Sequence, residues 1–286
     1  MTKPYLLGMY EKAVPASLSW RERLEVARES GFDYVEISID ESDAKLARLE
    51  WTSDERHELV RLQQETEMPI RSMCLSGHRK YPFGASDPAV RERSLQIMQQ
   101  AIELACDLGV RTIQLAGYDV YYEEGTEQTR ADFETNLGLA VEMAAREGVI
   151  LGFETMETPF MDTVQKSMVY VDKIGSPYLG VYPDMGNLTN ASFLYGNTVA
   201  DDIATGRGHI FAAHCKETVA GAYREIPFGT GTTDYEGALD ELVAQGVRRY
   251  VAEFWYVGSE DWRAETAFAA TYVRGKIDEA FERAGK

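Results

Sequence analysis

The chain has 286 residues, of which 44% are hydrophobic, so it can bury a large core. Its net charge of −18, without any basic stripe, argues against nucleic acid as a partner. No stretch approaches the roughly 18 uninterrupted apolar residues of a membrane span, and residues 1–4 lack the apolar run of a signal peptide, so we expect a soluble, cytoplasmic protein with no membrane partner.

Eight short apolar runs alternate with eight amphipathic stretches along the whole chain. The strands are predicted at 6–10, 34–39, 70–75, 112–115, 150–153, 179–183, 209–213 and 250–252. The helices are predicted at 17–30, from 52 onward, 87–108, 128–146, 164–174, 199–205, 235–244 and 261–280. No long linker or low-complexity segment interrupts this alternation.

Two of these helices have clear start signals. Thr52 and Glu55 have the spacing of a capping box. Asp87 followed by Pro88 is typical of a cap residue and a first helical position, and Gly109 is expected to end the same helix.

The order of elements favours one architecture. Eight β-α units of roughly 30 to 40 residues fit a single (β/α)8 TIM barrel, spanning 1–286 as one domain, better than an open doubly wound sheet. No Gly-x-Gly-x-x-Gly fingerprint follows the first strand, which also disfavours a dinucleotide-binding fold.

Four of the predicted strands end on side chains that can bind a metal: Glu154, Asp184, His214 and Glu253. The C-terminal ends of barrel strands converge on one face, and neighbouring strands lie about 5 Å apart. Three carboxylates and an imidazole in one place would repel one another without a divalent cation. We therefore predict one divalent metal ion, with Mn²⁺, Mg²⁺, Co²⁺ and Zn²⁺ all compatible with the donors.

Two glutamates beside a metal suggest proton transfer next to a carbonyl group. A metal chelated by a sugar carbonyl and its adjacent hydroxyl would lower the cost of forming an enediolate. Glu154 and Glu253 could then act on opposite faces of the sugar, one removing a proton and the other returning one. The alternative is that both are ligands only.

The cysteines have simpler interpretations. Cys74, Cys106 and Cys215 have no close spacing, which disfavours a disulfide framework or a cysteine zinc site. Cys215 follows His214 in a predicted strand and is expected to point away from the site.

The ligand pattern resembles the xylose-isomerase-like TIM-barrel superfamily, and longer motifs resemble its L-ribulose-5-phosphate 3-epimerase family. These motifs are GMYEKA at 8–13, MCLSGHR at 73–79, IQLAGYDVYY at 113–122, YPDMGNL at 182–188 and PFGTG at 227–231. The resemblance implies a metal-dependent isomerase of carbohydrate metabolism that interconverts L-xylulose 5-phosphate and L-ribulose 5-phosphate at C3, as in bacterial L-ascorbate degradation. It maps the acid/base pair onto Glu154 and Glu253. It also implies a homodimer, which a monomer in light scattering would contradict.

Two positions depart from common patterns of the superfamily. Asn187 stands where the epimerases of unphosphorylated ketoses typically have histidine, which favours the sugar-phosphate branch. Glu217 stands where His-x-Lys-Asp has its aspartate, so its role is left open.

A ketose phosphate needs cations in this acidic chain. The predicted candidates are His78, Arg79, Lys80, Lys216, Arg224 and Lys12, of which Lys216 is the strongest because it lies two residues after His214. Asn187 and Glu157 are candidates for contacts with sugar hydroxyls. Aromatic walls are expected from Tyr10, Tyr118, Trp255 and Tyr256, and backbone N–H groups from the glycine turn at 229–231.

Three other functions stay open at this point. The nearest is a 3-epimerase or aldose-ketose isomerase acting on an unphosphorylated sugar. A metal-dependent endonuclease would need more ligands than four histidines readily provide, and a basic face. A sugar sensor without catalysis would need no acid/base pair.

Overall fold

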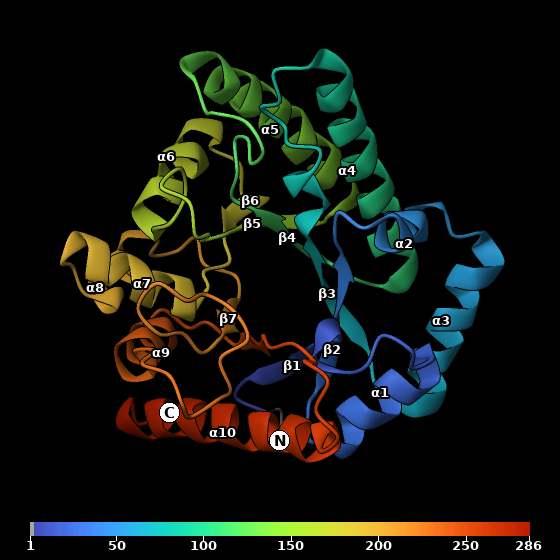
Figure 1. Ribbon diagram of the computed structural model, residues 1–286, viewed down its shortest axis with the longest axis vertical. Helices are drawn as coiled ribbons and strands as arrows, with labels where there is room; N and C mark the ends of the chain where they lie inside the picture. Colours follow the sequence, from blue (N-terminus) through green and yellow to red (C-terminus); the bar gives the residue numbers. More distant parts are fainter. Residues whose placement is uncertain (1–2) are drawn as a thin grey trace.

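The computed structural model describes residues 3–286; Met1 and Thr2, at the start of the predicted domain, lie outside the described residues. Eight parallel strands curl into a barrel with helices around it, which confirms the predicted fold class (Figure 1). The strands are β1 (Leu6–Tyr10), β2 (Tyr34–Ile39), β3 (Ile70–Leu75), β4 (Thr112–Ala116), β5 (Ile150–Glu154), β6 (Leu179–Val181), β7 (Ala213–Cys215) and β8 (Arg249–Ala252).

The barrel closes between β6 and β7, the two ends of the strand order β6-β5-β4-β3-β2-β1-β8-β7. Two isolated parallel bridges join them, Val181 with Ile210 and Asp184 with His214. The backbone N–H of His214 donates to the carbonyl of Pro183 at 2.9 Å. We call this junction the β6–β7 seam; it is less regular than the β4–β5 pairing, which has five registered pairs.

The seventh strand is where the sequence prediction was wrong in extent. We expected 209–213, whereas the regular strand is Ala213–Cys215 and Ile210 forms a single bridge. Residues 209–211 still pair with β6: the N–H of Val181 donates to the carbonyl of His209 at 2.8 Å, and the N–H of Phe211 donates to the carbonyl of Val181 at 3.2 Å. They also pack closely on Gly180, where a Cβ atom would lie 2.2 Å from the carbonyl oxygen of His209 and 2.5 Å from the ring of Phe211.

The helices follow the local signals of the sequence. They are α1 (Trp20–Glu29), α2 (Asp43–Leu46), α3 (Ser53–Thr66), α4 (Pro88–Leu108), α5 (Glu127–Glu147), α6 (Val164–Ile174), α7 (Met185–Tyr195), α8 (Val199–Thr205), α9 (Tyr235–Ala244) and α10 (Trp262–Arg283), with 3₁₀ turns at Glu11–Ala13, Ala47–Glu50 and Ser76–Arg79. The predicted capping box of Thr52 and Glu55 is present. Asp87 caps α4, and Gly109 ends it with a φ of 78°.

Two helices, α2 and α7, were missed in the sequence. Helix α7 contains Gly186, Asn187 and Asn190, which have low helix propensity. It is stabilised by its environment instead: Asp184 accepts a hydrogen bond from the backbone N–H of Asn187 at 2.6 Å, and most of the helix is buried. Tertiary contacts therefore outweigh local propensity at this site.

Side chains of β2 show how the two sides of the barrel wall differ. Val35, Ile37 and Ile39 belong to the main apolar core between strands and helices. Tyr34, in contrast, belongs to a smaller cluster with Tyr10, Cys74, Tyr182, Ala212 and Val251. Since side chains alternate along a strand, Glu36 and Ser38 share the inner side with Tyr34. The barrel interior thus contains polar groups as well as aromatic rings.

A buried charge cluster fixes the turn after β1. Glu11 is fully buried and forms ion pairs with Arg23, Lys45 and Arg48. Burial opposes ionisation of Glu11, but Arg48 and Lys45 outweigh it and lower the pKa to about 2. The cluster holds the Glu11–Ala13 turn, and with it Lys12, at the rim of the barrel.

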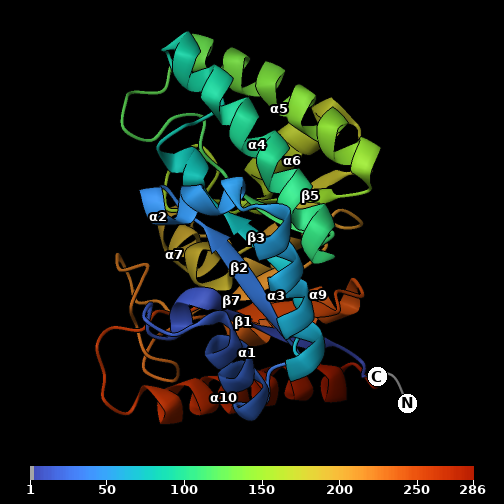
Figure 2. The same cartoon turned by 90° about the vertical axis from the view of Figure 1, so that its right-hand side faces the viewer.

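The loops that follow the strands gather at one end of the barrel, at the left in Figure 2, and the C-terminal end of α10 lies at the other. Within residues 3–286, no helix is both long enough and apolar enough to cross a membrane.

Substitution of Gly180 by alanine tests the packing of the seam. A methyl group 2.2 Å from a backbone carbonyl cannot be accommodated without moving the chain, so we expect G180A to lower the free energy of unfolding by about 1–3 kcal/mol. Gly275 lies in the interior of α10, and no atom lies within 4 Å of the position that a Cβ atom would take there. The control G275A should therefore raise the free energy of unfolding by about 0.5–1 kcal/mol. Urea unfolding measures both, and a G180A protein as stable as G275A would contradict the packing argument.

Candidate metal centre

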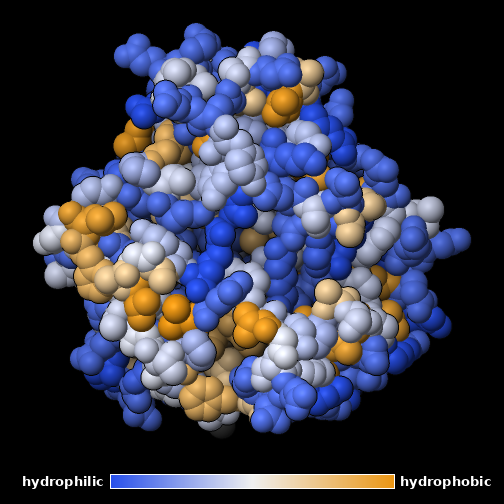
Figure 3. All heavy atoms as spheres, viewed as in Figure 1, coloured by the Kyte–Doolittle hydropathy of each residue, from blue (hydrophilic) through white to orange (hydrophobic). Residues whose placement is uncertain are grey.

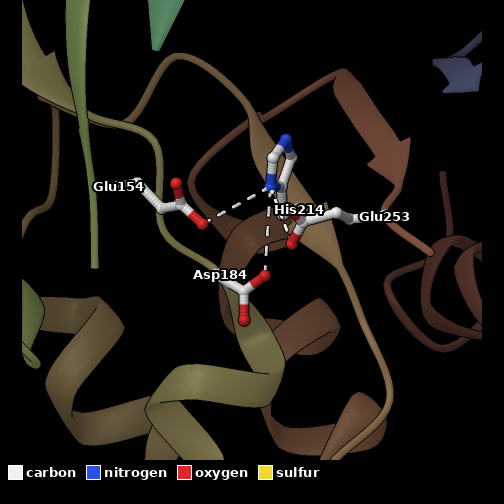
Figure 4. Close-up of side chains that lie close together, drawn as sticks. All are labelled: Glu154, Asp184, His214 and Glu253. Carbon is white, nitrogen blue, oxygen red and sulfur yellow. Dashed lines mark ion pairs between the residues drawn. The ribbon is translucent and has the colours of Figure 1, made fainter. Parts of the chain in front are cut away.

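Four side chains converge at the end of the barrel where the strands finish (Figure 4). Glu154 is the last residue of β5, Asp184 caps α7, His214 lies in β7 and Glu253 follows β8. One ligand atom from each lies within 4.8 Å of all the others, and all four residues are buried. Nδ1 of His214 is 3.3 Å from Glu253, 3.8 Å from Glu154 and 3.9 Å from Asp184.

These residues fit a divalent cation. Oδ2 of Asp184 and Oε2 of Glu253 are buried but accept no hydrogen bond. Nζ of Lys216 lies 3.2 Å and 3.4 Å from these two oxygens as an ion pair, which leaves the charge of three carboxylates only partly balanced. Buried carboxylate oxygens, together with one imidazole nitrogen, are ligands that hard and borderline divalent metals accept. The four residues could therefore bind one such ion.

The electrostatics of the four groups are unequal when no cation is present. Burial and the neighbouring Glu253 raise the pKa of Glu154 to about 8, and burial raises the pKa of Asp184 to about 6. Burial also disfavours the charged form of Glu253, but Lys216 and His214 outweigh it and hold its pKa well below the usual range. Glu154 is thus the carboxyl most easily protonated, and Glu253 the one most firmly ionised.

A cavity of about 170 Å³ opens directly above this group. In Figure 3 the hollow at the centre of this face is surrounded mostly by hydrophilic side chains. The predicted cations Lys12, Arg79, Lys216 and Arg224 line it, as do the predicted polar residues Glu157 and Asn187. Of the predicted aromatic walls, Tyr10 and Trp255 line the cavity and pack edge to face, with ring centres 5.9 Å apart.

Several of these side chains are held by partners within the protein. Nη2 of Arg224 donates to Glu157 at 3.1 Å, and Glu157 also accepts from the hydroxyl of Tyr118 at 2.7 Å. The amide of Asn187 donates to the carbonyl of Thr155 and accepts from Lys216 at 2.9 Å. Asn187 therefore fixes the position of Lys216, a role that its side-chain chemistry alone did not indicate.

His78 does not belong to this site, contrary to the sequence prediction. The 3₁₀ turn after β3 directs its ring away from the cavity and against Phe83, with ring centres 4.4 Å apart. Its Nε2 pairs with the carbonyl of Ser94 at 3.1 Å. Burial lowers its pKa to about 4, so it is neutral near pH 7 and offers no charge to a phosphate.

Four further predicted residues lie outside the cavity lining. One of them, Tyr118, was expected as an aromatic wall but is buried, and its hydroxyl donates to Glu157. Lys80 lies 3.8 Å from Asp43, and Tyr256 is partly exposed. Glu217, whose role was left open, accepts a hydrogen bond from the backbone N–H of Gly229 at 3.1 Å. It thereby anchors the glycine turn at 229–231 instead of facing the cavity.

Sequence reasoning missed Glu36, which is fully buried and contacts Nε2 of His214 at 2.6 Å through Oε1. A signal was available: β2 is apolar on its outer side, so a carboxylate at an inner position needs a polar partner inside the barrel. The identity of that partner could not be read from the sequence, because β2 and β7 are 178 residues apart at this contact.

Comparison with known proteins identifies the class of barrel to which this fold and this buried group of candidate ligands belong. Residues 24–272 match the model of the xylose isomerase-like TIM barrel family, and the chain belongs to that family. Over 281 residues, 98% of both chains, it is 42% identical to the L-ribulose-5-phosphate 3-epimerase UlaE of Escherichia coli, so it is a homologue of a sugar-phosphate isomerase.

Two solved structures share the fold. An L-ribulose 3-epimerase is 19% identical, with a TM-score of 0.77 over 98% of this chain and 97% of its own. A xylose isomerase-like barrel protein from Mycobacterium smegmatis, solved in complex with magnesium, is 14% identical, with a TM-score of 0.71 over 98% of this chain and 99% of its own. At such low identity these likenesses establish the fold only.

The raised pKa values of Glu154 and Asp184 predict a pH-dependent effect of metal on stability. A carboxyl whose pKa is higher in the folded protein than in the unfolded chain stabilises the fold at low pH, and this contribution is lost as the pH rises through the folded value, here about 6 for Asp184 and about 8 for Glu154. A bound cation replaces the lost protons. We expect the rise in Tm on adding Mn²⁺ to chelator-treated protein to be larger at about pH 8 than at about pH 5.5.

Thermal unfolding with and without metal measures this effect, and calorimetry in buffers of different ionisation enthalpy measures the protons released. An increment in Tm that does not vary with pH, without proton release, would contradict the assignment.

Proposed function

We propose that this protein is a metal-dependent 3-epimerase that interconverts L-xylulose 5-phosphate and L-ribulose 5-phosphate, using Mn²⁺, Mg²⁺, Co²⁺ or Zn²⁺ at the centre formed by Glu154, Asp184, His214 and Glu253. The observation that carries the proposal is the full-length identity of 42% to a protein named for this activity, combined with the buried ligand group. The homodimer implied by the resemblance and the cytoplasmic location expected from the sequence stay predictions.

Epimerisation at C3 requires two proton transfers on opposite faces of the sugar. Glu154 and Glu253 come from β5 and the end of β8, on either side of Asp184 and His214, and both line the cavity. Glu253 is ionised and can therefore accept the C3 proton in one direction, while Glu154, the more easily protonated, can supply one from the other face. Their roles exchange in the reverse direction.

Removal of the C3 proton places negative charge on the substrate oxygens. A bound divalent cation would supply Lewis-acid stabilisation of that charge. Lys216 adds a buried positive charge beside it, oriented by its hydrogen bond to Asn187. The rings of Tyr10 and Trp255 form part of the cavity wall and make it locally apolar.

The phosphate is the second element of the proposal. Arg79, Arg224 and Lys12 line the cavity on its outer side, and Nε of Arg79 is buried without a hydrogen-bond acceptor. An unsatisfied guanidinium N–H beside further cations suits a phosphate dianion. Arg79 is further held over the ring of Tyr121, 5.0 Å from its centre.

One observation favours the alternative of an unphosphorylated sugar. Arg224 is paired with Glu157 at 3.1 Å and Lys12 with Asp40 at 2.5 Å, so part of the positive charge at the cavity is already neutralised. A phosphate would have to share or displace these carboxylates.

Proton exchange at C3 tests the reaction. When metal-loaded protein acts on L-xylulose 5-phosphate in D₂O, we expect NMR to show deuterium entering at C3 while L-ribulose 5-phosphate forms. E154Q and E253Q should each lower kcat by about 10²–10⁴-fold, with the bound metal quantified because both residues are also ligands. Absence of exchange at every carbon, with metal bound, would contradict the proposal.

Substitution of Arg224 tests whether the protein recognises the phosphate group of its substrate. Its side chain is 42% exposed, so R224A should fold, and loss of a charge-assisted contact predicts a KM for the phosphorylated substrate about 10- to 100-fold higher, with a smaller change in kcat. The control R263A removes an arginine that is 60% exposed on α10. If R224A and R263A behave alike, or if the wild type turns over the free sugar as well as its phosphate, the unphosphorylated alternative gains.

A further inference from the structure

Glu36 is a carboxylate in the interior of the barrel without a lysine or arginine beside it among residues 3–286. Its side chain is fully buried, and its ion pair is with His214. Burial of a carboxylate is destabilising by several kcal/mol unless neighbouring groups stabilise its charge. A charged group in such a place calls for a specific explanation.

The contacts of Glu36 come from three other parts of the barrel. Oε2 accepts hydrogen bonds from Oγ of Ser72 in β3 at 2.7 Å and from the hydroxyl of Tyr182 after β6 at 2.9 Å. Oε1 lies 2.6 Å from Nε2 of His214 in β7. With Oε2 held by two donors, the carboxylate cannot rotate freely, and Oε1 stays directed at the imidazole.

This contact determines which ring nitrogen carries a proton. An ionised carboxylate only accepts hydrogen bonds, so the hydrogen between Oε1 and His214 belongs to Nε2. The other nitrogen, Nδ1, faces Glu253, Glu154 and Asp184 at 3.3–3.9 Å. A histidine binds metal through a nitrogen without a proton, so the Nε2–H form is the one that leaves Nδ1 free as a ligand.

Two other neighbours approach the ring. Oε2 of Glu253 lies 3.3 Å from Nδ1, a longer contact than the 2.6 Å between Oε1 of Glu36 and Nε2, and in the site it is a ligand for the same cation as Nδ1. The amide nitrogen of Gln114 lies 3.1 Å from Nδ1 and 3.2 Å from Nε2. An atom almost equally distant from both nitrogens of one ring must lie over its face, because within the ring plane it would collide with the carbon between them. Gln114 therefore packs on the imidazole and does not select a tautomer.

We propose that Glu36 is a positioning residue of the metal centre, which holds the proton on Nε2 of His214 and so presents Nδ1 to the cation. The inference rests on the metal centre of the proposed function, and it is independent of the identity of the substrate. Glu36 itself does not line the cavity, and among the described residues its side-chain hydrogen bonds and ion pair are with Ser72, Tyr182 and His214.

The wild-type protein allows a test without any substitution. In the Zn²⁺-loaded protein labelled with ¹⁵N-histidine, the signals of His214, assigned by their loss in H214N, should show a proton on Nε2 and none on Nδ1. A proton on Nδ1, or none on Nε2, would overturn the inference.

The variant E36Q measures the consequence. Glutamine keeps the size and one acceptor oxygen but removes the charge, and we expect Zn²⁺ to bind about 10- to 100-fold more weakly in calorimetry. The matched control S72A removes one hydrogen bond to Oε2 while leaving the carboxylate opposite His214, and it should weaken Zn²⁺ binding less than E36Q does.

Two results with E36Q would overturn the inference: Zn²⁺ affinity equal to that of the wild type, or losses of the same size in E36Q and S72A. If E36Q does not fold, the spectrum of the wild type decides. A wild type that binds no Zn²⁺ removes the inference together with the metal centre. Because no substrate is present, failure of the epimerase activity alone would leave these results unchanged.

Discussion

Mutual repulsion between buried carboxylates is the constraint on which the rest of this molecule depends. Glu36, Glu154, Asp184 and Glu253 all approach one imidazole, that of His214, from different strands of the barrel. Each would be unfavourable in an apolar interior, and together they are tolerable only with protons, with Lys216 and His214 as counter-charges, or with a divalent cation. Folding therefore holds the carboxylates close together in spite of their repulsion, and the site they form attracts positive charge.

The same constraint explains why the groups differ from one another. Lys216 lies beside Asp184 and Glu253 but has no ion pair with Glu154 among the described contacts, so the charge of Glu253 is stabilised while Glu154 retains its proton more easily. Two glutamates of identical chemistry thus differ in how readily they carry a proton, because of their surroundings. Asn187, by orienting Lys216, helps to set that difference, which gives the amide at this position a physical role.

The sequence was most informative where function requires a fixed position along a strand. The four ligands were recognisable because each closes an apolar run, and parallel strands in a barrel bring such ends together. Contacts between distant elements were not recognisable: the turn that buries His78 against α4 and the close packing of His209 and Phe211 on Gly180 depend on contacts that no local pattern encodes. Helix α7 was missed for the same reason, since burial stabilises a segment with weak helical propensity.

The β6–β7 seam has a consequence for the mechanics of the barrel. Asp184 and His214 form one of its two bridges, and they stand on opposite sides of the junction. A cation bound by both residues would link the two sides of the β6–β7 seam and would oppose motions that separate β6 from β7. Loading with metal would then slow hydrogen exchange first at β6 and β7, so a cation bound at this centre would also keep the barrel closed.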